Sequence, residues 1–268
     1  MVVRWRERRF VNALNADDWY VPIVARPDAG TRLICFAFAG GSAQVYDGWR
    51  FDKPGIEVRA AELPGHGARG LETPIAQAMA LVSALTDALL PLTDRRFALF
   101  GHSLGAFLAF GIARRLRVLD APGPALLIVA GQRAPQLPNR EAPLSHLDDR
   151  VFIDALRDYG GTPPDLLENR DYMRRVLPAL RADFMAAESF RYKPGEPLDC
   201  PILALGGRED TTVSETELNA WREQTRARFE LRIFAGGHFF VETARAEVLA
   251  AIADRMVSAA PAPSGAMK

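Results

Sequence analysis

The sequence has few cysteines, no long hydrophobic run and no excess of charge of either sign. Only two cysteines occur in 268 residues, Cys35 and Cys200, and each lies in or beside a short apolar run. Thiols in such runs are commonly buried parts of a core. We therefore interpret both cysteines as structural thiols.

The missing charge excess and hydrophobic runs exclude two classes of protein. Lysine plus arginine and aspartate plus glutamate both number 33, and the pI is about 6.9, which lacks the basic footprint of a nucleic-acid binder. The longest apolar runs, such as 125–130, are far shorter than the roughly 20 residues of a membrane helix. The arginine-rich first ten residues are not followed by the apolar stretch of a signal peptide. We expect a cytoplasmic protein with no nucleic-acid or membrane partner.

What remains is the composition of an ordinary globular protein, with 49% hydrophobic and 25% charged residues. A chain of this length can form one α/β domain, which we assign to residues 1–256. Residues 257–268 are mostly small residues and prolines, so we expect a disordered tail.

Short apolar segments alternate with stretches of helical spacing along most of the chain. The segments are continuously apolar, as in strands of a parallel sheet that is covered on both faces. Such alternation predicts an α/β fold with a mostly parallel sheet flanked by helices. The predicted strands are 33–38, 57–63, 97–100, 125–130, 201–205 and 229–234, and the predicted helices are 76–90, 104–116, 215–226 and 242–256.

One segment, from about 135 to 197, interrupts this alternation. It contains no good strand and two helical patterns, 148–159 and 171–190. A connection of that length is too long for an ordinary loop. Open α/β sheets place their ligand crevice at the carboxyl edge of the strands, so we predict a helical insertion over that edge and refer to it as the lid.

The sequence Gly101-His-Ser103-Leu-Gly105 matches the G-x-S-x-G motif. It lies between a predicted strand and a predicted helix, which is the context of the nucleophile elbow in α/β-hydrolases. The serine occupies a strained turn there, and glycines two positions away avoid collisions. We predict that Ser103 is the nucleophile of an α/β-hydrolase and that the Leu104 N–H, at the start of the helix, stabilises an oxyanion.

A serine nucleophile needs a base, and the chain offers only four histidines. His102 adjoins the nucleophile and is interpreted as a structural residue of the elbow. His66 lies in an early Pro-Gly-His-Gly turn, and His146 lies in the lid as a packed or solvated residue. His238 follows the last predicted strand, which gives the order nucleophile, acid, histidine of this fold, so we predict His238 as the base.

The acid that orients the histidine should follow a late strand. Residues 131–140, after one candidate strand, contain no carboxylate, whereas the strand 201–205 leads to Glu209 and Asp210. The acid is therefore Asp210 or Glu209. We favour Asp210 because its shorter side chain suits the usual geometry and the residues after it resemble a helix entry, which leaves Glu209 as a solvated loop charge.

A second oxyanion donor should come from the loop after the first predicted core strand. That loop, residues 38–41, reads Phe-Ala-Gly-Gly, and its glycines permit close backbone approach. We predict the N–H of Ala39 as this donor.

With these residues in view, the sequence resembles the type II thioesterases that accompany modular polyketide synthases and nonribosomal peptide synthetases. The resemblance covers roughly residues 19–256, with leucine at position 104 where many members carry methionine. It implies hydrolysis of aberrant or misprimed acyl groups from the phosphopantetheine arm of carrier proteins, without metal or redox cofactor. The motifs that carry it are 36–42 (FAFAGGS), 63–67 (LPGHG), 101–105 (GHSLG), 160–164 (GGTPP), 177–184 (LPALRADF) and 237–240 (GHFF).

Three interpretations stay open at this point. Arg181 and Asp183 are interpreted as a structural pair that holds the lid to the core. Arg114, Arg115 and Arg117 form either a solvated face or a contact for an acidic carrier protein. We expect a monomer, and the competing functions are a carboxylesterase or lipase acting on oxygen esters, a product-releasing thioesterase, and a carrier-binding module without chemistry.

Overall fold

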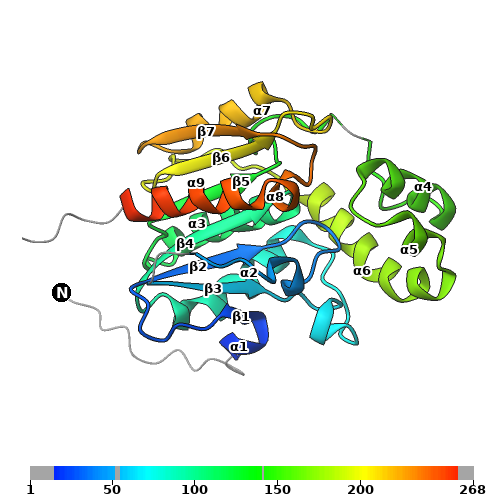
Figure 1. Cartoon of the computed structure of the whole chain (residues 1–268), viewed down its shortest axis with the longest axis horizontal. Coiled ribbons are helices and arrows are strands. Elements are labelled where there is room, and N and C mark those ends of the chain that lie inside the picture. The colour runs from blue at the N-terminus through cyan, green and yellow to red at the C-terminus, as the bar shows by residue number, and fades with distance from the viewer. Residues whose placement is uncertain (1–14, 52–54, 141, 259–268) are drawn as a thin grey trace, which may run out of the picture.

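The computed structural model describes residues 15–51, 55–140 and 142–258. A single seven-stranded sheet runs through these residues in the order β1-β3-β2-β4-β5-β6-β7 (Figure 1). Strand β1 is antiparallel to β3, and all other neighbours are parallel. The strands are β1 Tyr20–Val24, β2 Thr31–Phe36, β3 Ile56–Ala61, β4 Arg96–His102, β5 Leu126–Ala130, β6 Ile202–Gly207 and β7 Phe229–Phe234.

The predicted α/β class and all six predicted strands are confirmed, with ends that shift by a few residues. The strand that the sequence did not indicate is β1, at the edge of the sheet. Pro22 lies in its middle, and proline is tolerated in strands mainly at such edges. Its sequence, YVPIV, is as apolar as that of the inner strands, but the central proline is unfavourable in an inner strand.

Helices cover both faces of the sheet. Helices α2 and α3 pack on one face and α9 on the other, and alternate residues of β4, such as Leu99 and Phe100, enter the two resulting cores. The predicted helix 242–256 is divided in two at Ala244, and the predicted helix 215–226 is α7 followed by a 3-10 helix, Ala220–Gln224. The helices outside the lid are α1 Ala16–Trp19, α2 Ala78–Leu89, α3 Leu104–Val118, α7 Glu215–Asn219, α8 Phe240–Thr243 and α9 Arg245–Ser258.

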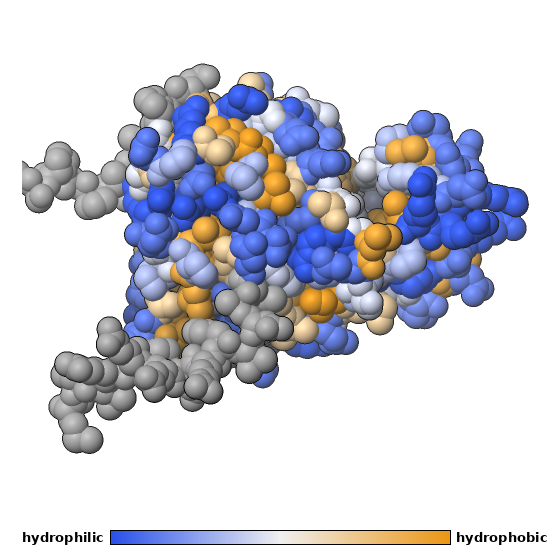
Figure 2. All heavy atoms as spheres, turned by 90° about the horizontal axis from the view of Figure 1, so that it is seen from below, coloured by the Kyte–Doolittle hydropathy of each residue, from blue (hydrophilic) through white to orange (hydrophobic). Residues whose placement is uncertain are grey.

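The predicted lid segment is helical, and its described residues form no strand. It contains α4 Asp149–Tyr159, α5 Pro164–Glu168 and α6 Arg170–Ser189, so α5 adds to the two helices predicted. These helices share a small core of their own, around residues such as Phe152 and Leu177. Helices α4 and α5 lie beyond one end of the sheet, and α6 leads back toward it (Figure 1). In the space-filling view they form a lobe that is separated from the body by an indentation (Figure 2).

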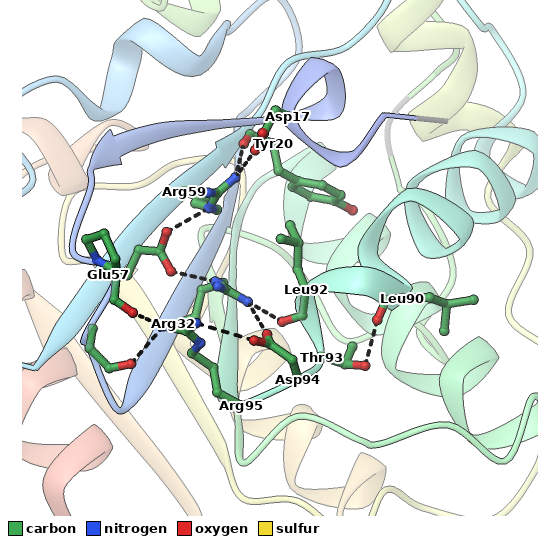
Figure 3. A network of polar contacts seen from close by, with 12 residues as sticks. Asp17, Tyr20, Arg32, Glu57, Arg59, Leu90, Leu92, Thr93, Asp94 and Arg95 are labelled. Carbon is green, nitrogen blue, oxygen red and sulfur yellow. Dashed lines mark hydrogen bonds and ion pairs between the residues drawn. The ribbon is translucent and has the colours of Figure 1, made fainter. Parts of the chain in front are cut away.

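At the amino ends of β2 and β3 lies a network of charged side chains (Figure 3). Buried Arg32 and Glu57 form an ion pair of 2.7 Å, and Glu57 also binds Arg59 at 2.8 Å. Exposed carboxylates complete the network, with Asp17 on Arg59 and Asp94 on Arg32. Burial alone would raise the pKa of Glu57, but the two guanidinium groups outweigh it and lower that pKa. The pairing compensates the cost of burying these charges. The network lies at the amino ends of the strands, whereas Ser103 lies at their carboxyl ends.

The two chain ends bear on two expectations. Helix α9 continues to Ser258, so the expected tail 257–268 begins in a helix, which corrects that prediction for its first two residues. Residues 259–268 and the arginine-rich residues 1–10 lie outside the described residues. Among the described ranges, no helix is both long enough and apolar enough to cross a membrane.

Candidate active site

Ser103 lies in a strained turn between β4 and α3. Its backbone angles are φ 53° and ψ −117°, in a region that residues other than glycine rarely adopt. A Cβ atom on Gly101 would lie 2.1 Å from the Gly105 carbonyl oxygen, and one on Gly105 would lie 2.1 Å from that of Phe36. The prediction of a tight elbow that needs both glycines is therefore confirmed.

The elbow opens into a pocket of about 1130 Å³ at the carboxyl edge of the sheet. Every residue predicted for the site lines this pocket: Ser103, Leu104, Asp210, His238 and Ala39. In the described part of the chain, the N–H groups of Ala39 and Leu104 donate no hydrogen bond to another residue. Two donors beside a strained serine are suited to stabilise a developing oxyanion.

His238 and Asp210 follow β7 and β6, and their side chains meet. The distance from His238 Nδ1 to Asp210 Oδ2 is 2.9 Å. Burial alone would raise the pKa of Asp210, but hydrogen bonds from His238 and Thr212 outweigh it and lower that pKa. Asp210 is thus held as a carboxylate that fixes the ring of His238.

Thr212 is a part of this pair that the sequence analysis did not identify. Its N–H and its hydroxyl group donate to Asp210 Oδ1 at 2.8 and 2.7 Å. An aspartate that accepts the N–H two residues later forms an Asx turn, so Asp-x-Thr was the available signal. The turn holds one carboxylate oxygen and leaves the other for His238.

The other ring nitrogen of His238, Nε2, is the atom that would take the proton of Ser103. Among the described residues it has no hydrogen-bond partner, Ser103 included. Such contacts are often long in substrate-free enzymes and shorten in the substrate complex. Ser103 and His238 line the same pocket without a hydrogen bond between them, as is common in substrate-free enzymes.

His102 is buried beside His238 and binds its backbone. Its Nε2 donates to the backbone carbonyl of His238 at 2.9 Å, and the centroids of the two rings lie 5.1 Å apart. Burial, together with the neighbouring His238, lowers the pKa of His102 to about 3, so the ring is neutral. The interpretation of His102 as a structural residue of the elbow is confirmed.

Glu209 does not contact His238, but it is more than a solvated charge. Although exposed, its carboxylate accepts the N–H of Gly236, two residues before His238. This bond links the loop after β6 to the loop after β7. The expectation of a merely solvated Glu209 is corrected, because the loop needs a partner for that N–H.

The two remaining histidines differ from each other. His146 is exposed in the lid and does not line the pocket. His66, expected as an ordinary turn residue, is buried and lies 2.9 Å from Asp183 Oδ2. The predicted pair of Arg181 with Asp183 is wrong, because residues two apart on a helix point to different sides. Arg181 instead binds Asp149 at 2.7 Å within the lid.

The arginines of α3 are not a free face. Arg114 donates to the carbonyl of Lys193, and Arg117 binds Asp199 at 2.9 Å. Arg115 pairs with Asp87 of α2 at 3.4 Å. Arg114 and Arg117 therefore hold the chain that returns from α6 to β6, which corrects the interpretation of these arginines as a solvated face.

The lid supplies an apolar wall of the pocket. Aromatic and aliphatic side chains from α4 and α6 line it, together with Phe107 of α3. Apolar surface of this kind is typical of small-molecule sites, and the charged residues Arg175 and Glu188 of α6 also line the pocket. The lid residues of this wall are Leu156, Tyr159, Tyr172, Val176, Leu180 and Phe184.

The parallel sheet, the serine elbow after β4 and the His238–Asp210 pair after the last strands define the class of the protein as an α/β-hydrolase. A family model described as "Thioesterase domain" matches residues 31–256. The chain is 37% identical over 241 residues to the gramicidin S biosynthesis protein GrsT of Aneurinibacillus migulanus, covering 90% of this chain and 93% of that protein. It is 36% identical over 258 residues to thioesterase PikA5 of Streptomyces venezuelae, covering 93% and 90%.

Solved structures agree with these matches. The type II thioesterase BorB from the borrelidin biosynthetic cluster is 36% identical, with a TM-score of 0.81, covering 91% of this chain and 99% of that one. The type II thioesterase YbtT from the yersiniabactin pathway is 31% identical, also with a TM-score of 0.81, covering 90% and 99%. The chain belongs to the thioesterase family of hydrolases and is similar over most of its length to type II thioesterases of such pathways.

Proposed function

We propose that this protein is a type II thioesterase that hydrolyses aberrant or misprimed acyl groups from the phosphopantetheine arm of carrier proteins in a modular synthase. The observation that carries the proposal is one pocket in which Ser103, the His238–Asp210 pair and two N–H donors converge. The relatives of similar length, from gramicidin S biosynthesis, the borrelidin cluster and the yersiniabactin NRPS/PKS pathway, support the choice of substrate.

The first half of the reaction forms an acyl-enzyme. His238 Nε2 takes the proton of Ser103 as its oxygen attacks the thioester carbon, and Asp210 stabilises the resulting imidazolium. The negative oxygen of the tetrahedral intermediate accepts hydrogen bonds from the N–H groups of Ala39 and Leu104. The carbon–sulfur bond then breaks, and His238 returns the proton to the departing thiol.

The second half releases the acid. His238 takes a proton from water, and the oxygen of that water attacks the acyl carbon on Ser103. The tetrahedral intermediate collapses, the bond to Ser103 breaks, and the serine regains its proton from His238. Serine, histidine and water supply every bond and proton, so we propose a reaction without metal or redox cofactor.

The pocket suggests how the two ends of the substrate are bound. The acyl group would lie against the apolar lid wall, and the pantetheine arm would enter between the lid and the body. We propose that the enzyme acts in the cytoplasm, as a monomer, on carrier proteins.

The proposal is tested with a panel of acyl and peptidyl carrier proteins, followed by mass spectrometry of the carriers. We expect aberrant or misprimed acyl groups to disappear and the free acid to appear, and Ser103→Ala to abolish both. A panel left intact by the wild-type enzyme would refute the proposal.

The same chemistry can serve oxygen esters, so a second comparison is needed. Values of kcat/KM on acyl-pantetheine thioesters and matched oxygen esters separate the two substrate classes. A marked preference for oxygen esters would identify a carboxylesterase, and a macrocyclic product would identify a product-releasing thioesterase.

A further inference from the structure

A second histidine–aspartate pair lies next to the loop that carries Ala39. His66 follows β3 and Asp183 belongs to α6, and His66 Nε2 lies 2.9 Å from Asp183 Oδ2. Both side chains are almost fully buried, with 4% and 3% of their surface exposed. Buried ionisable groups cost stability unless they are well paired, so this contact differs from an ordinary ion pair on the surface.

The surroundings of His66 favour its protonated form. Its Nδ1 lies 3.2 Å from the carbonyl oxygen of Pro64, so both ring nitrogens face acceptors and both must carry protons. Burial would lower the pKa of His66, but Asp183, the Pro64 carbonyl and Glu62 outweigh it and raise that pKa. With both ring nitrogens facing acceptors, the protonated form of His66 is favoured.

Asp183 connects this charge to the oxyanion loop, residues 38–41. The oxygen that binds His66 also accepts the N–H of Gly40, at 2.7 Å. Gly40 has a φ of +84°, and a Cβ atom on it would lie 2.3 Å from the side chain of Leu180. The loop therefore packs directly on the lid helix α6, at the residue after Ala39.

This contact restricts the part of the backbone that would stabilise the oxyanion. The bond to Asp183 fixes the peptide plane between Ala39 and Gly40, and a second bond, from Gly41 N to the Phe38 carbonyl at 2.9 Å, closes the loop. The remaining freedom of Ala39 is small, so its N–H keeps one direction. Misplacement of a catalytic group by about 1 Å can cost roughly 100-fold in rate.

We propose that Asp183, with its charge balanced by His66, is a positioning residue for the oxyanion hole and couples the lid helix α6 to catalysis. The inference rests on the proposed function, because it assumes that Ala39 stabilises the oxyanion of a thioester reaction. Asp183 does not touch the reacting atoms and acts through the backbone of residues 39–40.

The test compares Asp183→Ala, Asp183→Asn and Arg181→Ala. Each variant is assayed for kcat and KM on an acyl-pantetheine thioester and for affinity toward a trifluoromethyl ketone with the same acyl chain, which forms a tetrahedral adduct on serine. Arg181 is the matched control, because it lies on the same helix and tethers it within the lid without contacting the oxyanion loop.

We expect Asp183→Ala to lower kcat by about 100-fold and to lower affinity for the ketone in proportion, with KM within about 3-fold. Asparagine retains an oxygen for the Gly40 N–H, so Asp183→Asn should lower kcat by only about 10-fold. Arg181→Ala should lower the melting temperature and keep kcat within about 3-fold.

Other results would overturn the inference. If Asp183→Asn and Asp183→Ala lower only the melting temperature, Asp183 is structural, and if KM alone rises, it acts on substrate binding. Should Asp183→Ala fail to fold, Asp183→Asn decides, and wild-type kcat with wild-type ketone affinity in that variant refutes the proposal. Absence of thioester hydrolysis in the wild-type enzyme would instead refute the proposed function.

Discussion

Two histidine–aspartate pairs share the same distance of 2.9 Å, and they do different things. His66 presents both ring nitrogens to acceptors, whereas His238 uses Nδ1 for Asp210 and leaves Nε2 without a partner among the described residues. The first pair is a locked charge, and the second is a base with a free nitrogen. The chemistry of such a pair is decided by its remaining hydrogen bonds, not by the carboxylate alone.

The largest expected effect on turnover comes from removing the free base. We expect His238→Ala to lower kcat by roughly 10⁴-fold or more, because members of such a triad act as a unit. His66→Gln should cost far less, about 100-fold at most, because it disturbs only positioning. Steady-state kinetics on one acyl-pantetheine thioester measures both, and equal losses in the two variants would remove the distinction between the pairs.

The next effect concerns the partner of that base. Asp210→Asn should lower kcat by about 10³- to 10⁴-fold, because asparagine cannot hold the histidine in the productive tautomer. Glu209→Gln is the control and should stay within about 3-fold, since glutamine can still accept the Gly236 N–H. The reverse pattern would make Glu209 the acid.

The locked pair should be visible in the pH dependence of stability. The pKa of His66 is raised in the folded protein, so its contribution is fully present below the unfolded value of about 6.5 and is lost as pH rises through the raised value. His66→Gln should remove this contribution, of about 1–3 kcal/mol, from the free energy of unfolding at low pH.

Urea denaturation of wild type and His66→Gln across this pH range checks the effect. The groups facing His66 are Asp183, Glu62 and the Pro64 carbonyl, and Arg69 acts on Glu62. The wild-type advantage should shrink as pH rises. An advantage that grows with pH would mean that His66 is neutral in the folded protein.

The smallest effect on turnover should come from the charged network at the amino edge of the sheet (Figure 3). Glu57→Gln removes the buried charged partner of Arg32 and leaves it only the exposed Asp94, and removing one member of a buried pair costs about 3–5 kcal/mol of stability. Its kcat should remain within about 3-fold of wild type where the protein is folded, because the network lies opposite the pocket. A large loss of kcat with unchanged stability would contradict this separation.

Local sequence was enough for the inner strands, the elbow and the His238–Asp210 pair. Each rests on a pattern within a few residues, such as the G-x-S-x-G motif or a carboxylate directly after a strand. Asp210 was preferred over Glu209 from side-chain length, and the geometry agrees, since Asp210 is the one that contacts His238.

Contacts between residues far apart in the chain could not be predicted from local sequence patterns. His66 and Asp183 are 117 positions apart, so His66 was expected as a turn residue and Asp183 was paired with its neighbour Arg181. Strand β1 was missed although its sequence, YVPIV, is apolar, because the central Pro22 argues against a strand. The contact of His66 with Asp183 depends on how the lid packs, and the pairing of β1 depends on the edge of the sheet.

The most direct test of the central claim is to trap the acyl-enzyme. Wild-type enzyme is mixed with an acyl carrier protein and quenched in acid within a turnover, and the enzyme is digested and analysed by mass spectrometry. We predict the acyl mass on the peptide that contains Ser103, with none in Ser103→Ala. An adduct on another residue, or full hydrolysis by Ser103→Ala, would contradict Ser103 as the nucleophile.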